Sequence, residues 1–256
     1  MRLQTDLLGS RARVKDRYAL IPLEGIPFSR LPEWPDALVQ VLAAPPLGAD
    51  FAQYRLELAA GHHGEHAADG EIEHFLYLLE GDAALAVLDV EKRGRTEHAL
   101  TPGGFALIPP TADYRLEART AVTLLLLRKV YEPVQGIDLY STLVGREQDV
   151  PGQVYLGDEG ALLQTLIPDE FAYDLAMNIF TFQTGHSLPV TETHLMEHGL
   201  YVLAGKGLYY LDDTWMEVEE SDFIWMGPFC PQSYYATGPT PTRYIYYKNV
   251  NREIQL

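Results

Sequence analysis

The chain has 256 residues, of which 47% are hydrophobic, so it can bury one large core or two small ones. Its formal net charge of −17 at pH 7 argues against nucleic acid as a partner, because phosphate binding needs clustered Lys and Arg. A membrane span is excluded by the lack of a long apolar run, and one cysteine with no apolar leader makes a cytoplasmic location the expectation.

Short apolar or alternating runs recur between Gly, Pro and Asp, which is typical of an all-β protein. In the first half, the expected strands are 38–43, 51–58, 73–79, 83–88, 105–108 and 122–130. In the second half, they are 173–182, 200–203, 207–211, 216–218, 223–226, 232–236 and 243–248. The run 162–166 is ambiguous, and a helix near 158–165 is an alternative reading of it.

The two halves of the chain resemble each other. Residues 54–81 align without a gap on 178–205, at a constant offset of 124 (178 − 54). A repeat of roughly 120 residues has the size of a duplicated small β-barrel. We therefore expect three parts: an N-terminal barrel with its arm (1–135), a linker rich in Gly and Pro (136–157), and a C-terminal barrel (158–256).

The stretch 192–198 holds the most distinctive chemistry. Glu192, His194 and His198 all have even numbers, so one extended strand would project them to the same face, whereas Glu197 would face away from the barrel. Gln232 starts a later strand and can add an amide oxygen. This donor set suits Mn(II), Fe(II), Zn(II) or Ni(II), and four protein ligands leave two positions of an octahedral ion open for catalysis.

The repeat indicates which half carries the site. The positions opposite the four candidate ligands are Ala68, Gly70, His74 and Tyr114, and only one of them is an imidazole. One histidine cannot hold a divalent ion, so the first barrel is expected to be structural. The histidine-rich segment 62–66 could form a second metal site with His74, but a solvated loop is the favoured interpretation.

The final predicted strand places Tyr244, Tyr246 and Lys248 on one face. If that face lines the barrel, Lys248 could bind a substrate carboxylate or move a proton. If the alternation is inverted, Lys248 faces water. Tyr209 has the parity of the site residues, and its alternative is a place in the aromatic core.

On these residues the chain resembles the bicupins and, within them, the (S)-ureidoglycine aminohydrolases of the allantoin pathway, whose bacterial members have been labelled glyoxylate-induced proteins. The resemblance runs from Asp6 to Arg252. Its most specific pieces are Glu192-Thr-His194 with Glu-His198-Gly, Asp222-Phe-Ile-Trp-Met-Gly-Pro, and Tyr-Lys248-Asn-Val-Asn-Arg252.

The resemblance implies an all-β bicupin, that is, two tandem double-stranded β-helix (jelly-roll) barrels. It implies a Mn(II) enzyme that releases ammonia from (S)-ureidoglycine, a small anionic ureido acid, to give (S)-ureidoglycolate in purine catabolism. The metal ligands of this family correspond to Glu192, His194, His198 and Gln232. Its substrate-binding and catalytic residues correspond to Tyr209, Tyr244 and Lys248, and one of several groups, Lys248 and Tyr209 among them, would move the proton.

Two other functions fit the same scaffold. One is a Mn- or Fe-dependent dioxygenase or decarboxylase acting on a small carboxylate. The other is a non-catalytic bicupin that binds a small ligand. In each case a homo-oligomer is expected, because barrels with exposed strand edges commonly pair.

Overall fold

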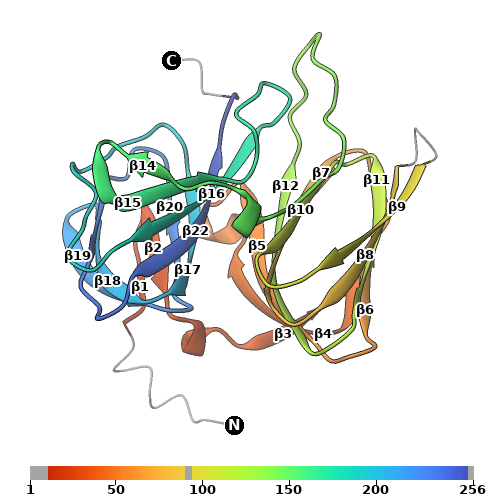
Figure 1. Ribbon diagram of the computed structural model, residues 1–256, viewed down its shortest axis with the longest axis horizontal. Helices are drawn as coiled ribbons and strands as arrows, with labels where there is room; N and C mark the ends of the chain where they lie inside the picture. The colour runs from red at the N-terminus through yellow and green to blue at the C-terminus, as the bar shows by residue number, and fades with distance from the viewer. Residues whose placement is uncertain (1–10, 90–93, 253–256) are drawn as a thin grey trace. The chain divides into compact units, whose positions relative to one another are not determined.

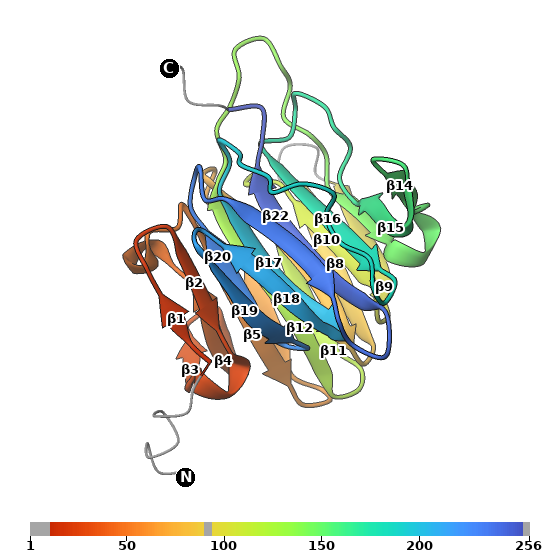
Figure 2. The ribbon, with the colours of Figure 1, turned by 90° about the vertical axis from the view of Figure 1, so that its left-hand side faces the viewer.

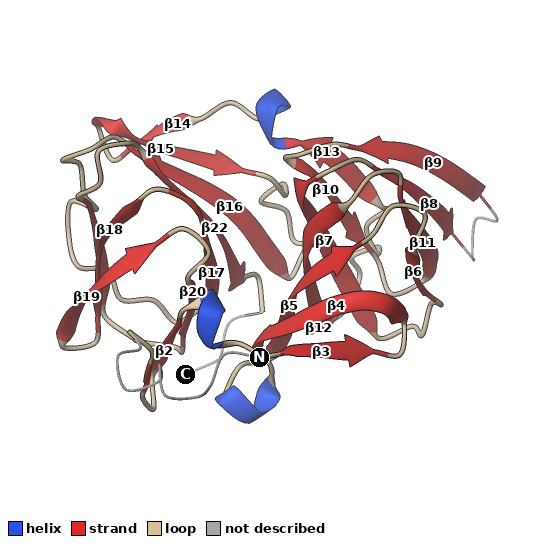
Figure 3. Ribbon diagram, turned by 90° about the horizontal axis from the view of Figure 1, so that it is seen from below, coloured by secondary structure: helices blue, strands red, loops and turns tan. Residues whose placement is uncertain are grey.

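The computed structural model describes residues 11–89 and 94–252, so Asp6, at which the resemblance begins, lies outside the described residues. Strands dominate, and the helices described are three single turns of 3-10 type at Leu23–Gly25, Pro45–Leu47 and Glu147–Asp149 (Figure 3). No helix in this described part of the chain is long and apolar enough to cross a membrane. The chain divides into two compact units, one of them Pro27–Val150 and the other made of the residues up to Ile26 together with those from Pro151 onward.

The unit Pro27–Val150, hereafter the first barrel, consists of two antiparallel sheets (Figure 1). The larger sheet contains β3 (Phe28–Leu31), β4 (Trp34–Ala43), β5 (Phe51–Leu58), β7 (Ile72–Glu80), β10 (Gly104–Ile108), β12 (Val122–Val130) and β13 (Leu143–Arg146), in the order β13-β10-β7-β12-β5-β4-β3. The smaller sheet contains β6 (His63–His66), β8 (Ala83–Asp89), β9 (Gly94–Leu100) and β11 (Ala112–Ala118), in the order β6-β11-β8-β9. Apolar side chains from both sheets, such as Leu76 and Leu116, form one core cluster between them.

The other unit, hereafter the second barrel, has the same plan. Its larger sheet contains β1 (Arg13–Val14), β2 (Tyr18–Ile21), β14 (Gln153–Tyr155), β15 (Asp158–Thr165), β16 (Leu175–Phe182), β17 (His198–Ala204), β20 (Phe223–Met226) and β22 (Thr242–Asn249), in the order β1-β2-β20-β17-β22-β16-β15-β14. Figure 2 shows β20, β17 and β22 side by side in it. The smaller sheet is β19 (Thr214–Glu219), β18 (Lys206–Leu211) and β21 (Gln232–Ala236).

Equivalent strands pair in the same register in the two barrels. His74 of β7 lies opposite Arg128 of β12, and His198 of β17 lies opposite Lys248 of β22. The internal repeat found in the sequence is therefore a repeat of structure as well. It also makes Arg128 the positional counterpart of Lys248, which the repeat in the sequence does not reveal.

The alternative of a helix near 158–165 is wrong. This segment forms β15, which is hydrogen-bonded to β14 on one side and to β16 on the other. A short apolar run carries no periodicity that separates a helix from a buried strand. Hydrogen bonding to β14 and β16 makes this segment a strand.

The division of the chain differs from the expected ranges at both boundaries. β2 pairs with β20, so the N-terminal arm belongs to the second barrel. Arg11 donates a hydrogen bond of 2.9 Å to the carboxylate of Asp222, whose side chain is 1% exposed. The expected linker 136–157 holds strands of both barrels, since β13 pairs with β10 and β14 pairs with β15. The pairings β2–β20 and β13–β10 join segments far apart in sequence, which local patterns do not reveal.

Gly64 of β6 is required by the packing of Trp34. A Cβ at this position would lie 2.0 Å from the indole ring, which is itself buried in the core. We expect Gly64→Ala to lower the free energy of unfolding of the first barrel by about 1–3 kcal/mol, because an indole held by core packing cannot move aside freely. Guanidinium denaturation would measure this change. Gly94→Ala in the same barrel is the control, since a Cβ there has open space and the change should be near neutral.

Candidate metal and substrate site

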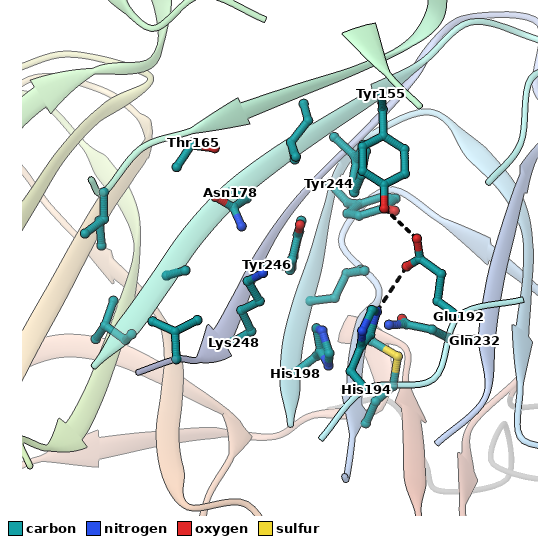
Figure 4. Close-up of a pocket in the computed structure, with 18 of the residues that line it drawn as sticks. Tyr155, Thr165, Asn178, Glu192, His194, His198, Gln232, Tyr244, Tyr246 and Lys248 are labelled. Carbon is teal, nitrogen blue, oxygen red and sulfur yellow. Dashed lines mark hydrogen bonds and ion pairs between the residues drawn. The ribbon is translucent and has the colours of Figure 1, made fainter. Parts of the chain in front are cut away.

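A cavity of about 210 Å³ lies inside the second barrel (Figure 4). Ligand pockets for drug-sized molecules measure roughly 300–1,000 Å³, so this one suits a small metabolite. The polar residues that line it are Tyr155, Thr165, Asp169, Asn178, Glu192, His194, His198, Tyr209, Gln232, Tyr244, Tyr246 and Lys248. All seven site residues expected from the sequence are among them.

Three separate elements bring the four candidate metal ligands together. Glu192 and Gln232 exchange both backbone hydrogen bonds, at 2.8 and 2.9 Å, as an isolated antiparallel bridge. Residues directly opposed in such a pair project to the same face, which places both side chains in the cavity. His194 follows in an irregular segment held by a hydrogen bond from the Phe229 N–H to its carbonyl oxygen, 2.7 Å. His198 is the first residue of β17.

The expectation that one extended strand carries 192–198 is therefore wrong. The backbone from 193 to 197 is irregular and bends at residues 195 and 196. Glu197 does not line the cavity, as its odd position indicated. It is nevertheless 3% exposed, and its carboxylate accepts a hydrogen bond of 3.2 Å from the indole N–H of Trp225. Glu197 thus anchors the irregular segment to β20.

The ligand atoms form hydrogen bonds with their neighbours. The Glu192 carboxylate lies 3.2 Å from His194 Nε2 and accepts a hydrogen bond of 2.6 Å from the Tyr155 hydroxyl. Gln232 Oε1 accepts one of 2.9 Å from the Tyr209 hydroxyl. Among the described residues, no three His, Cys, Asp or Glu side chains are already spaced to hold a metal ion. The donor types fit a divalent cation, but the His194–Glu192 contact would have to give way to coordination.

Electrostatics in the cavity suit ligand binding. Burial, aided by the neighbouring His194 and Lys248, lowers the pKa of His198 to about 3, so its imidazole is neutral and has a free lone pair. Burial alone would raise the pKa of Glu192, but hydrogen bonds from His194 and Tyr155 outweigh it and the net shift is downward. A neutral imidazole beside an ionised carboxylate is the state that binds a dication.

Lys248 and two tyrosines line the cavity beside the candidate ligands: Lys248 is directly opposite His198 on the adjacent strand, and the Tyr209 hydroxyl contacts Gln232. Tyr244 and Lys248 project into the cavity from β22, so of the two alternatives for this strand the one in which Lys248 lines the barrel is correct. Burial raises the pKa of Tyr209 and of Tyr244 well above 10. Both phenols therefore stay protonated at neutral pH and act as hydrogen-bond donors. Lys248 is the one Lys or Arg among the described residues that line the cavity.

Comparisons with known proteins fit this picture, although no family model matches the chain. The chain is 32% identical to (S)-ureidoglycine aminohydrolase of Escherichia coli over 98% of its length and 95% of that protein. It is 33% identical to the Arabidopsis thaliana enzyme of the same name, over 96% of the chain and 80% of that protein. The chain belongs to the (S)-ureidoglycine aminohydrolase family. This confirms the resemblance inferred from the sequence.

Solved structures confirm the fold expected of this aminohydrolase family. A Pseudomonas aeruginosa protein described as glyoxylate induced is 37% identical, with a TM-score of 0.86 over 96% of this chain and 94% of that one. Bacillus subtilis oxalate decarboxylase matches with a TM-score of 0.71 at 13% identity, over 94% of this chain and 79% of that one. The all-β bicupin architecture predicted from the sequence is therefore correct.

The first barrel has a different interior at the equivalent place. His74 shares a hydrogen bond of 2.8 Å with the Tyr114 hydroxyl. The favoured interpretation of 62–66 as a solvated loop is wrong, because 63–66 form β6 and the His66 ring lies 4.1 Å from the His74 ring, centroid to centroid. Trp34 packs into the same core. A structural role for this barrel stays a prediction.

Four polar residues of the cavity are not among those expected from the sequence, namely Tyr155, Thr165, Asp169 and Asn178, and two of them bear on the site. Tyr155 lies in the expected linker, where no strand had been predicted. Asn178 lies within a predicted strand, and its signal was available: it is the one amide in the otherwise apolar and hydroxyl-bearing run Leu175–Phe182. A polar side chain on a buried strand face needs a hydrogen-bonding partner or a ligand.

Tyr155 holds the Glu192 carboxylate in place, so we expect Tyr155→Phe to weaken metal binding. Loss of a hydrogen bond to a ligating carboxylate typically costs about 10–100-fold in metal affinity. Titration of metal-free protein with Mn(II) would measure the dissociation constant. The control is Tyr210→Phe. Tyr210 follows the cavity residue Tyr209 on β18, so it projects from the other face of that strand and does not line the cavity. Equal dissociation constants for Tyr155→Phe and the parent protein would contradict this role.

Proposed function

We propose that the protein releases ammonia from (S)-ureidoglycine and produces (S)-ureidoglycolate, as a step of purine catabolism. The observation that carries the proposal is the composition of one cavity in the second barrel. It holds a Glu-His-His-Gln donor set, and Lys248 and two protonated tyrosines face the same space. Relatives that share about a third of their residues with this chain are named for that reaction.

We propose Mn(II) as the cofactor, with Glu192, His194, His198 and Gln232 as its ligands. Two imidazoles with two oxygen donors suit this ion, and Fe(II), Zn(II) or Ni(II) would also be accepted. When bound, the metal would supply positive charge that offsets the negative charge of the carboxylate substrate. The neutral state of His198 and the ionised state of Glu192 support this assignment.

Lys248 is proposed to carry the proton. Its ammonium group would pair with the substrate carboxylate and donate a proton to the amine nitrogen, which leaves as ammonia while the ureido nitrogen forms a C=N bond to the same carbon. Water then adds to that carbon, and its proton returns to Lys248. Tyr209 is less suited to this step, because its hydroxyl already donates to Gln232.

Tyr244 is proposed to orient the substrate. Its phenol is buried and protonated, so it can donate a hydrogen bond to a carboxylate oxygen but cannot accept a proton at neutral pH. A homo-oligomer stays a prediction from the sequence.

The test is an assay of purified protein on freshly generated (S)-ureidoglycine, combined with elemental analysis of bound metal. Release of one ammonia per substrate, with bound Mn(II), supports the proposal. Oxygen consumption or release of carbon dioxide would instead favour a dioxygenase or decarboxylase. Tight binding of the ureido acid with no turnover and no metal would identify a non-catalytic bicupin.

A further inference from the structure

Asn178 lines the cavity from β16 (Figure 4). The residue is 4% exposed. Its Oδ1 is buried and has no hydrogen-bond partner, and it is the only such side-chain atom among the described residues that line this cavity. A buried acceptor without a partner destabilises the folded protein, so a ligand that offers an N–H group would relieve a penalty already present.

The other half of this carboxamide is occupied. Asn178 lies directly opposite Tyr246 on the adjacent strand β22. Burial raises the pKa of the Tyr246 phenol, and a hydrogen bond from the Asn178 side chain opposes that rise. The amide nitrogen therefore donates to Tyr246, which fixes the direction of the group and leaves Oδ1 for another donor.

The position of Asn178 fits one end of a small ureido acid. The strand order β17-β22-β16 places it two strands from His198, roughly 10 Å across the sheet at about 4.8 Å per strand, and two residues further along, because His198 is opposite Lys248 whereas Asn178 is opposite Tyr246. Lys248 lies on the strand between them. A ureido acid held by its carboxylate at Lys248 would thus extend its terminal NH2 group toward Asn178.

We propose that Asn178 Oδ1 accepts a hydrogen bond from the terminal NH2 of the ureido group and so selects ureido acids over other small carboxylates. This inference rests on the proposed function, because it concerns the same substrate in the same cavity. It assigns Asn178 a role in specificity, and the chemistry at the amine-bearing carbon remains with Lys248.

A matched pair of inert probes isolates this contact. N-carbamoylglycine carries a ureido group, and N-acetylglycine has a methyl group in place of its terminal NH2. The parent protein, loaded with Mn(II), should bind the first more tightly than the second by about tenfold or more in calorimetric titrations. Asn178→Leu should bind both with similar Kd values, because the acceptor is gone. A parent protein without the preference, or a leucine variant that keeps it, would overturn the inference.

Asn178→Asp provides the rescue. It retains acceptor oxygens, so it should keep the preference for N-carbamoylglycine, although its charge weakens binding of both acids. Asn178→Ala repeats the test if leucine disturbs packing, as monitored by thermal unfolding. Turnover separates the two proposals: a parent protein that releases no ammonia refutes the function, whereas an active parent whose leucine variant keeps both the preference and the original KM refutes only the role of Asn178.

Discussion

Replacing Lys248 with methionine is expected to lower kcat for ammonia release by about 10²–10⁴-fold, the range that general acid–base catalysis contributes. Methionine has a similar length but provides neither a charge for the substrate carboxylate nor a proton for the leaving amine. Lys248 is not one of the four candidate metal ligands, so bound metal should stay at the parent level. Steady-state kinetics together with elemental analysis would measure both quantities.

The control for this substitution is Lys206→Met. Lys206 lies in β18 of the same barrel, where its ammonium group is exposed and forms a surface ion pair of 3.4 Å with Glu217. It does not line the cavity, so its removal should leave kcat unchanged. Full activity of Lys248→Met with normal metal content would show that this lysine neither binds the substrate nor moves the proton.

The second large effect is expected at His198. Its exchange for glutamine should lower metal affinity by more than the roughly 10–100-fold caused by losing an outer hydrogen-bond partner, because a neutral imidazole nitrogen is replaced by a weaker and differently placed amide donor. His198 is 5% exposed and neutral, and it lies at the start of β17 beside the other candidate ligands. The measurement is the amount of Mn(II) retained per chain after dialysis against a weak chelator.

The repeat provides a matched control for this experiment. His74 is the positional counterpart of His198 in the first barrel, and it is buried in the same way. His74→Gln should leave bound metal unchanged, because the first barrel has Ala68 and Gly70 where the second barrel has Glu192 and His194, and so lacks the equivalent ligand set. Loss of metal from His74→Gln and not from His198→Gln would show that the metal binds in the first barrel, and would overturn the assignment.

Much of the fold could be predicted because two of its signals are local in sequence: the alternation of apolar and polar residues along a strand, and the Gly, Pro and Asp residues that separate the strands. The strands at Phe51–Leu58, Val122–Val130, Phe223–Met226 and Gln232–Ala236 have the predicted bounds. The phase of β22 was also available, since side chains two residues apart share a face. Alternation alone is therefore enough to place Tyr244 and Lys248 together on one face, and the structure shows that this face lines the cavity.

The parts that sequence reasoning missed depend on contacts between distant segments. The candidate ligands do share a cavity, but the predicted continuous strand over 192–198 does not exist. A bridge between Glu192 and Gln232 and an irregular segment that ends at His198 produce the same convergence. Tyr155 could not be found, because its value lies in one hydrogen bond to a residue 37 positions later in the chain.

The pairing of β2 with β20 makes the second barrel discontinuous in sequence, with the whole first barrel inserted into it. Arg11 and Asp222 are separated by 211 residues. At roughly 5–20 residues per second, a ribosome would need about 10–40 s to deliver the second partner after the first. The first barrel can form during that interval, whereas the second barrel, which holds the candidate site, must wait for nearly the last strands. A destabilising substitution in the N-terminal arm would therefore impair folding of the second barrel, most of which is synthesised last.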